Sequence, residues 1–405
     1  MDKMVTGSFQ LMKQMNKTLI LDIIRTHGPI SRAEIAKMTK LTPPTVTNLV
    51  KDLLSTGMVV EGERMNSTGG RKAINLQINP TAYYVIGVNV GVSKVSVVVT
   101  DLMANVVVES SSALQHVSSD RIMDVVVETI RRCMQSSRVK ADKFMGIGVG
   151  MHGLVNAEEG VAVFAPNFGL RDVHVKEIIE QTFDIPTYLD NDVRAMALGE
   201  SWFGHGQNVD NFIFINVGMG IGAGIVLQEE VYRGISESAG EIGHTTVVED
   251  GPQCNCGNHG CLEVMAAGPA IAKRAVKAIN DGAQTRLTKR VNDQLDEITA
   301  KIIHEEAVDG DPLCRQIIED TGKYLGIGIA NLINIFNPAK IIIGGGVSNA
   351  GQMLLEPLIH TALVRAMEVP ASKVSIETTP LHDRVGPIGA ATLVLKHIFK
   401  QPNLG

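Results

Sequence analysis

The sequence has few cysteines and no long hydrophobic run. Five cysteines in 405 residues are too few for the disulfide framework of a secreted protein, and Cys133 and Cys314 stand alone. No apolar stretch reaches the length of a membrane span. The start, Met1-Asp2-Lys3, lacks the charged-then-apolar pattern of a signal peptide. We therefore expect a cytoplasmic protein, whose length allows two or three domains.

Charge is distributed unevenly along the chain. The net charge is −6, yet residues 1–80 hold eleven Lys or Arg against six Asp or Glu, a net of +5. The remaining residues are acidic. A small basic module joined to an acidic body suggests that one end binds nucleic acid and the other binds something else.

The first 80 residues predict a winged helix-turn-helix. An apolar helical face at residues 19–24 ends at Gly28-Pro29, and Ser31–Glu34 reads as a capping box that opens a second helix with Ile35 and Met38 inward. Thr42 is expected to cap a third helix with a buried apolar stripe. Two short strands at 58–61 and 73–78 would hold a basic wing between them.

Polar side chains on the outer face of the third helix are typical of a recognition helix, because short polar groups there can reach base edges and phosphates. Arg71 in the wing could enter a minor groove. The alternative is a small helical domain that binds protein. The predicted DNA contacts are Ser31, Arg32, Thr42, Thr45, Thr47, Asn48, Lys51, Arg71 and Lys72.

A repeated pattern organises the rest of the chain. Residues 85–101 read as a strand, a glycine turn and a strand, and residues 212–226 repeat this design. Two such hairpins, each followed by helices, indicate an internal duplication around a cleft. Glycines between the strands would let backbone N–H groups approach a ligand's oxygens.

Three cysteines within eight residues follow a histidine. His244, Cys254, Cys256 and Cys261 match the Cys₃His ligand set of a closed, tetrahedral structural zinc site. Reduced cysteines without metal, or disulfides, are the alternatives. Metal binding is the usual role of such spacing in a cytosolic chain.

These motifs resemble the ROK family, which groups bacterial sugar kinases with sugar-responsive repressors on an actin-like, hexokinase-like fold. The most specific part is Gly240–His244 with the Cys-x-Cys…Cys-x-Glu segment, and residues 189–194, 341–346 and 386–389 follow in family order. The resemblance implies an α/β chain with an N-terminal winged helix-turn-helix and a duplicated two-lobed body. The expected domains are 1–80, then 81–195 with the returning helix 385–405, then 196–384 with the zinc site and a dimerisation surface.

The resemblance also implies a set of sugar-binding residues. A sugar's hydroxyls both donate and accept hydrogen bonds, which suits carboxylates and amides in a cleft. In kinases of the family the residue at Asp192 is the general base, and His244 could bind zinc through one nitrogen and sugar through the other. A helix cap is the alternative role for Asn191 and Asp192. The implied set is Asn167, Asn191, Asp192, Glu241, His244 and Glu263.

One departure from the family concerns catalysis. ATP-using relatives carry Asp in the first hairpin, followed by Gly-Gly-Thr, whereas this chain has Asn89 and Val92. An amide cannot supply the negative charge that helps to hold Mg²⁺ beside the phosphates. The hypothesis is that sugar recognition survives and phosphoryl transfer is lost or weak, so that the chain is not an enzyme.

The sequence therefore predicts a DNA-binding repressor of sugar uptake or metabolism genes. Its expected partners are an operator, a sugar or sugar phosphate, and further copies of the same chain in a dimer or tetramer. In one branch of the family a phosphotransferase-system glucose transporter domain releases the repressor, but residues 161–176 and Ile221 resemble the sugar-type relatives more. An ATP-dependent sugar kinase with an added DNA-binding module is the main alternative. A zinc-stabilised interaction protein would leave the paired glycine hairpins unexplained.

Overall fold

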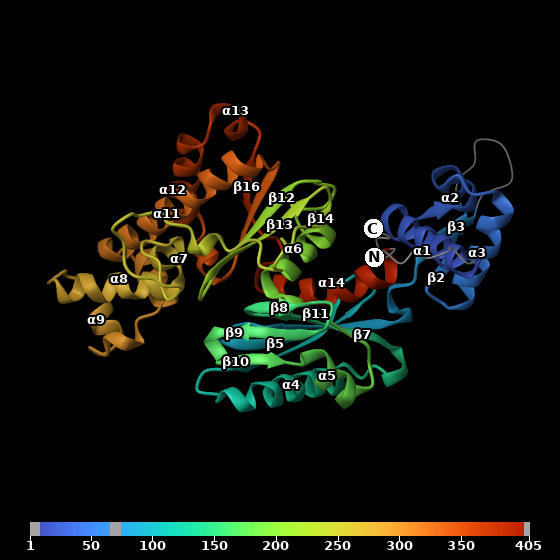
Figure 1. The fold of residues 1–405 in the computed structure, drawn as a ribbon, viewed down its shortest axis with the longest axis horizontal. Helices are drawn as coiled ribbons and strands as arrows, with labels where there is room; N and C mark the ends of the chain where they lie inside the picture. The colour runs from blue at the N-terminus through green and yellow to red at the C-terminus, as the bar shows by residue number, and fades with distance from the viewer. Residues whose placement is uncertain (1–8, 65–73, 401–405) are drawn as a thin grey trace.

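A small N-terminal module stands beside a larger body that contains two five-stranded sheets (Figure 1). The computed structural model describes residues 9–64 and 74–400. In the module, three helices pack on a sheet with strand order β1-β3-β2, which confirms the predicted winged helix-turn-helix. Its elements are α1 (Phe9–His27), β1 (Ile30–Ser31), α2 (Arg32–Thr39), α3 (Pro43–Ser55), β2 (Val59–Arg64) and β3 (Ile74–Ile78).

Local chemistry sets the helix starts in the module. The Ser31 hydroxyl accepts the Glu34 N–H, and the Glu34 carboxylate accepts the Ser31 N–H, so the capping box is formed. Thr42 caps α3, with Pro43 in its first turn, where a missing N–H costs little. The inward placement of Met38 was wrong. Met38 is 47% exposed, and the short helix α2 turns Ile35 and Ala36 toward the core instead.

The buried stripe of α3 is confirmed, with Val46, Leu49, Val50 and Leu53 in the module's core. Residues 65–73, between β2 and β3, contain the predicted contacts Arg71 and Lys72 and lie outside the described residues.

The two sheets of the body follow one plan. In the first, strand order is β11-β7-β4-β5-β6, and in the second it is β16-β15-β12-β13-β14. Each sheet has an antiparallel hairpin at its centre, a third antiparallel strand beside it, and two parallel strands on the other side. The shared order confirms the duplicated α/β fold. The strands are β4 (Tyr84–Val90), β5 (Lys94–Asp101), β6 (Val106–Ala113), β7 (Phe144–Met151), β11 (Thr187–Asn191), β12 (Phe212–Val217), β13 (Ile221–Leu227), β14 (Glu230–Val231), β15 (Lys340–Gly344) and β16 (Ser375–Thr378).

A further three-stranded sheet and a set of helices complete the body. The small sheet holds β8 (Leu154–Asn156), β9 (Val161–Ala165) and β10 (Leu170–Val173). The helices are α4 (Ile122–Ser137), α5 (Val175–Phe183), α6 (Asp192–Phe203), α7 (Leu262–Ala266), α8 (Gly268–Asn280), α9 (Leu287–Arg290), α10 (Ala300–Val308), α11 (Pro312–Phe336), α12 (Gln352–Arg365), α13 (Glu368–Ala371) and α14 (Val385–Phe399).

Helix α14 joins the parts of the molecule (Figure 1). It packs on β4 and β7 of the first sheet, on α6, and at its end on α1 of the module. The approach is close: a Cβ at Gly148 would lie 1.8 Å from the carbonyl oxygen of Ala390, so only glycine fits there. Leu395 and Phe399 of this helix are buried in the core.

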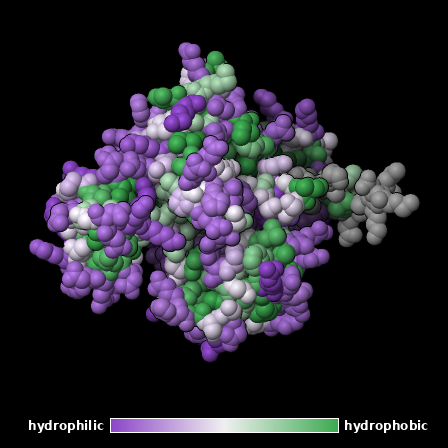
Figure 2. Space-filling model, turned by 60° about the vertical axis from the view of Figure 1, so that its left-hand side comes forward, coloured by the Kyte–Doolittle hydropathy of each residue, from purple (hydrophilic) through white to green (hydrophobic). Residues whose placement is uncertain are grey.

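Hydrophilic side chains cover most of the face in Figure 2, and hydrophobic ones reach the surface near its top, where α13 lies. Ile335 of α11, Val364 of α12, Met367 just before α13, and Val369 of α13 are each about 70% exposed. Across the described residues, none of the helices has the length and apolar character needed to pass through a membrane.

Candidate functional site

A cavity of about 1180 Å³ lies between the two lobes. Its wall includes Asn89 and Asp192 from the first lobe and Gly218, Glu241 and Gly345 from the second. Small-molecule sites usually measure about 300–1,000 Å³, so this cavity has room for a sugar and more. The predicted sugar-binding residues that line it are Asn191, Asp192, Glu241, His244 and Glu263.

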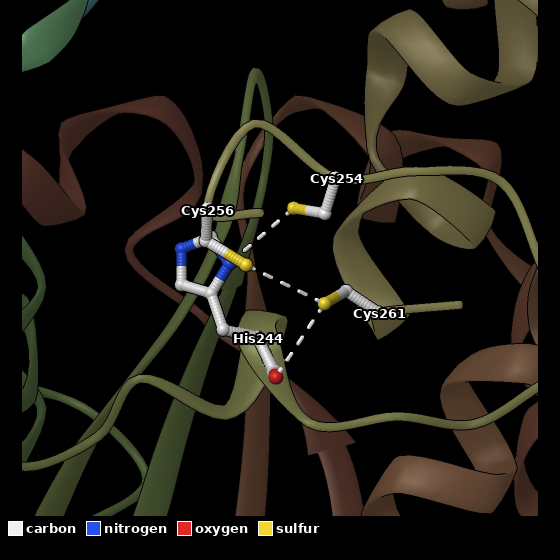
Figure 3. Close-up of side chains that lie close together, drawn as sticks. All are labelled: His244, Cys254, Cys256 and Cys261. Atoms are coloured by element: carbon white, nitrogen blue, oxygen red, sulfur yellow. Dashed lines mark hydrogen bonds between the residues drawn. The ribbon is translucent and has the colours of Figure 1, made fainter. Parts of the chain in front are cut away.

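Next to the cavity, four side chains converge on one point (Figure 3). The ligand atoms of His244, Cys254, Cys256 and Cys261 all lie within 4.8 Å of one another. His244 Nδ1 is 3.6 Å from the Cys254 sulfur, and the Cys256 and Cys261 sulfurs are 3.8 Å apart. Four ligands at Zn–S and Zn–N distances of about 2.0–2.3 Å on a tetrahedron are separated by about 3.5–3.8 Å. The arrangement therefore fits a zinc ion, and the cysteines are free rather than joined in disulfides.

Two thiols of the cluster have pKa values shifted in opposite directions. The Asn258 backbone N–H lowers the pKa of Cys256 to about 7, while burial raises the pKa of Cys261 to about 12. A metal ligand must be the thiolate, so a cation beside Cys261 is what would hold its negative charge. Turns around Gly257 and Gly260, both with positive φ, bring the cysteines together.

His244 links the cysteine cluster to the cavity. Its Nδ1 faces Cys254, and its Nε2 lies 3.9 Å from a carboxylate oxygen of Glu241, which also lines the cavity. Burial raises the pKa of Glu241, with Glu263 adding to the shift and His244 opposing it. Glu263 accepts the N–H of Ile221 at 3.0 Å and is held against the second hairpin.

Asn191 and Asp192 lie where β11 ends and α6 begins. Asn191 is the N-cap of α6: its Oδ1 accepts the N–H groups of Val193 and Arg194 at 3.0 and 3.1 Å, and its Nδ2 donates to Gly153. The helix cap, which the sequence left open, is thus a real role of Asn191 alongside its place in the cavity wall. Asp192 is 6% exposed, and burial raises its pKa.

His152 is the residue that sequence reasoning missed. It follows β7, lines the cavity, and lies with Nδ1 3.9 Å from Asp192 and Nε2 2.7 Å from the amide nitrogen of Asn167. Asn167 itself is exposed and reaches the cavity only through this contact. The pairing of Met151 with Asn191 in parallel strands brings His152 next to Asp192, a relation that the sequence alone does not reveal.

Ion pairs around the buried Asp190 hold the loop before Glu241. Arg233 contacts Asp190 at 2.5 Å and Glu237 at 2.8 Å. Arg194, whose side chain is 2% exposed, contacts Asp190 at 2.7 Å and donates to the Glu237 carbonyl. Removing one partner of such a network leaves a buried charge unpaired, which is costly. These ion pairs therefore hold the two edges of the cavity, at Asp192 and at Glu241, in place relative to each other.

At the first hairpin, Asn89 lines the cavity and packs against Gly386, where a Cβ would approach its amide to 2.7 Å. Its buried Oδ1 has no hydrogen-bond partner among residues 9–64 and 74–400. The side chain facing this part of the cavity is thus a neutral amide.

The module presents a separate polar surface. Thr42, Thr47, Asn48 and Lys51 are exposed along α3, and Thr45 is partly exposed. Two other predicted contacts, Ser31 and Arg32, have partners within the module. Ser31 is 5% exposed within its capping box. Arg32 contacts Glu61 at 2.7 Å.

Known protein families match both the N-terminal module and the body of the chain. The model of the ROK family matches residues 85–397, and that of the MarR family matches residues 14–69. The xylose repressor of Caldicellulosiruptor bescii is 34% identical over 397 residues, or 98% of this chain and 99% of that protein.

Two solved structures are similar over different lengths. A ROK family transcriptional regulator, a homologue of the Escherichia coli MLC protein, has a TM-score of 0.83 at 29% identity and covers 96% of this chain and 97% of its own. A ROK family glucokinase from Streptomyces griseus, solved with glucose and AMPPNP, has a TM-score of 0.70 at 30% identity and covers 76% of this chain and 98% of its own. With a family match over residues 85–397 and a relative similar over nearly its whole length, this chain belongs to the ROK family.

Proposed function

We propose that the chain is a cytoplasmic DNA-binding repressor whose operator affinity is controlled by a sugar or sugar phosphate in the interlobe cavity. The observation that carries this proposal is the combination, in one chain, of a winged helix-turn-helix with a two-lobed body whose cavity is lined by the carboxylates of Asp192, Glu241 and Glu263. The relatives named above include a xylose repressor and a transcriptional regulator of nearly the same length.

The proposed DNA-binding surface is the exposed side of α3. Thr45, Thr47 and Asn48 offer short hydrogen-bonding groups near the helix N-terminus, and Lys51 offers a phosphate contact. The net charge of +5 over residues 1–80 supports this surface, because phosphate neutralisation supplies much of DNA affinity.

The proposed sugar site is the part of the cavity wall around Asp192 and Glu241. Burial raises the pKa of both carboxyls, and a sugar hydroxyl would give each a hydrogen-bond partner that replaces water. His152 joins the set, because it connects Asn167 to Asp192. A sugar at this position would contact both lobes and favour one of their relative arrangements.

The body derives from a kinase fold, and we propose that it does not transfer phosphate. The support is Asn89, a neutral side chain where ATP-using members of the family carry Asp, and Val92 in place of a glycine. Without an anionic ligand at this hairpin, Mg²⁺ and its waters lose one anchor beside the phosphates.

Zinc is proposed as a structural ion bound by His244 and the three cysteines, which would fix the ring of His244 so that its Nε2 faces Glu241.

A homodimer is proposed because a two-fold operator mirrors a two-fold protein. The exposed apolar surface of Ile335, Val364, Met367 and Val369 supports dimerisation through the second lobe. We also propose three domains, which are residues 1–80, residues 81–195 together with 385–405, and residues 196–384.

For DNA binding, the Lys51→Ala variant is expected to bind a duplex selected from a random pool more weakly than the wild type does. The loss of affinity should be equal for duplexes of related sequence. The slope of log K against log salt should fall by about 1, because one phosphate contact is lost. Gel-shift titrations at several salt concentrations measure this. Lys143→Ala, in the body, is the control. An unchanged affinity and slope for Lys51→Ala would contradict the assignment of α3.

For sugar binding, the Asp192→Asn variant is expected to lose affinity by about 10- to 100-fold, the usual effect of removing a hydrogen bond to a charged group. Calorimetry with D-xylose, D-glucose, N-acetylglucosamine and their phosphates measures this. The matched control is Asp184→Asn, an exposed residue of the first lobe. Equal affinity of Asp192→Asn and the wild-type chain for the sugar that binds would exclude this part of the cavity.

For catalysis, the wild-type chain with Mg·ATP and the same sugars is expected to release no more ADP than it does without sugar. Sugar kinases that use this chemistry turn over at about 1–100 per second. A coupled ADP assay measures the rate, and Asn89→Asp, which restores the negative charge, is the comparison. Turnover by the wild-type chain within that range would make it a kinase.

For the metal, the Cys254→Ser variant is expected to lose the zinc, about one ion per chain, that elemental analysis should find in the wild type. Its melting temperature should fall, because zinc binding contributes to folding. Cys133→Ala, a buried cysteine distant from the cluster, should keep the zinc. A wild-type chain purified without chelator that holds no zinc would contradict the proposal.

A further inference from the structure

One arginine connects the DNA-binding module to the body. The Arg25 guanidinium of α1 stacks over the ring of Trp202, 3.9 Å from its centroid, and lies 5.7 Å from that of Phe399. The guanidinium also donates to Asp22, from Nε at 3.0 Å and from Nη2 at 2.7 Å to a single carboxylate oxygen. The Arg25 side chain is only 13% exposed. A guanidinium on an indole face is an attractive and directional contact, strongest when water is excluded.

The contact lies in a hydrophobic core that continues from the module into the body. Ile20 and Ile24 of α1 belong to the same buried cluster as Leu198 and Trp202 of α6 and Phe399 of α14. The module is thus packed against the ends of α6 and α14, rather than held by a flexible linker alone. A movement of either helix end would act on α1 directly.

Helix α6 reaches from the proposed sugar site to this contact. It starts at Asp192, in the cavity wall, and its last turn contains Trp202. Twelve residues at a rise of 1.5 Å give a length of about 18 Å. Most of its residues are buried, so it is expected to move as a rigid body.

Contacts along α6 tie it to both lobes. Glu200, which is fully buried, bonds to Thr379 at the end of β16 in the second lobe. Ala197 packs on Gly224 of β13, where a Cβ would approach to 2.4 Å. On the other side, Gly389 of α14 lies against the backbone of Ala195. A change in the angle between the lobes therefore has to alter the packing of α6 on α14 or its contacts with the second lobe.

We infer that Arg25 and Trp202 are positioning residues, and that their stack transmits the state of the sugar site along α6 to the DNA-binding module. This inference rests on the proposed function. Sugar bound at Asp192 shifts α6 against α14, the stack on Trp202 changes, and α1 turns the module relative to the body. The operator affinity then depends on the sugar although no sugar atom contacts the module.

The chain provides its own probe, because Trp202 is its only tryptophan. Calorimetry first identifies which of D-xylose, D-glucose, N-acetylglucosamine or their phosphates binds the full-length chain. We expect the sugar identified in this way to change the fluorescence emission of Trp202 or its quenching by acrylamide. The sugar concentration at the midpoint of this change should match the affinity that calorimetry gives. An emission that stays constant at full sugar occupancy would overturn the inference.

The second measurement is the ratio of duplex dissociation constants with and without the sugar, for which coupled systems give about 5- to 150-fold. In the Arg25→Met variant the ratio is expected to fall to about 1, while sugar affinity stays within about twofold. Arg131→Met is the matched control, since Arg131 also pairs with an acid three residues earlier, Glu128, and lies over a ring, that of Phe183.

The outcomes separate the inference from the proposed function. Equal ratios in the wild type and in Arg25→Met would overturn the inference and leave the sugar-responsive repressor intact. A wild type that binds no sugar and no duplex would remove both. Should Arg25→Met fail to fold, the Trp202 emission of the wild type still decides.

Discussion

The structure depends on the close packing of α6, which contacts both lobes and α14. Small residues at Ala195, Ala197 and Gly389 allow close approach, and the buried Glu200 accepts hydrogen bonds from the Thr379 hydroxyl and the His205 N–H. Close packing of this kind has few alternative arrangements, so a helix held this way shifts as a unit. That constraint is what allows a cavity at one end of α6 to influence a module at the other.

Electrostatics in the cavity explain how a kinase fold can serve as a sensor. In the proposed function the neutral Asn89 removes one anchor for a metal-bound nucleotide, while the carboxyls of Asp192 and Glu241, both with raised pKa values, remain available to hydroxyl groups. The metal-type cluster at His244 and the ion pairs of Asp190 hold the two edges of this site. In this account binding energy is used to select a lobe arrangement rather than to stabilise a reaction.

Features determined by neighbouring residues were predictable from the sequence. The capping box at Ser31, the stripe of α3 and the convergence of His244 with three cysteines all arise within short segments. The position of Met38 was not, because the periodicity of an eight-residue helix does not fix which turns reach the core. His152 was missed since a lone histidine becomes meaningful only through the pairing of β7 with β11.

Contacts between distant segments lay further beyond the sequence. Nothing in the pattern around Arg25 points to Trp202, because their contact requires the module, α6 and α14 to be assembled first. The family resemblance supplied the list of sugar-site residues and the sequence offered a helix cap as the alternative for Asn191, but only the structure shows that Asn191 both caps α6 and lines the cavity. Long-range packing decides such double roles.

The central claim is that the sugar and the DNA compete through the conformation of one chain. Thermodynamic linkage requires the effect to be reciprocal. The most direct measurement is therefore the calorimetric affinity of the chain for its sugar, free and saturated with operator duplex. The account predicts weaker sugar binding to the DNA complex, by the factor with which the sugar weakens DNA binding. Identical sugar affinities in the two states would contradict it.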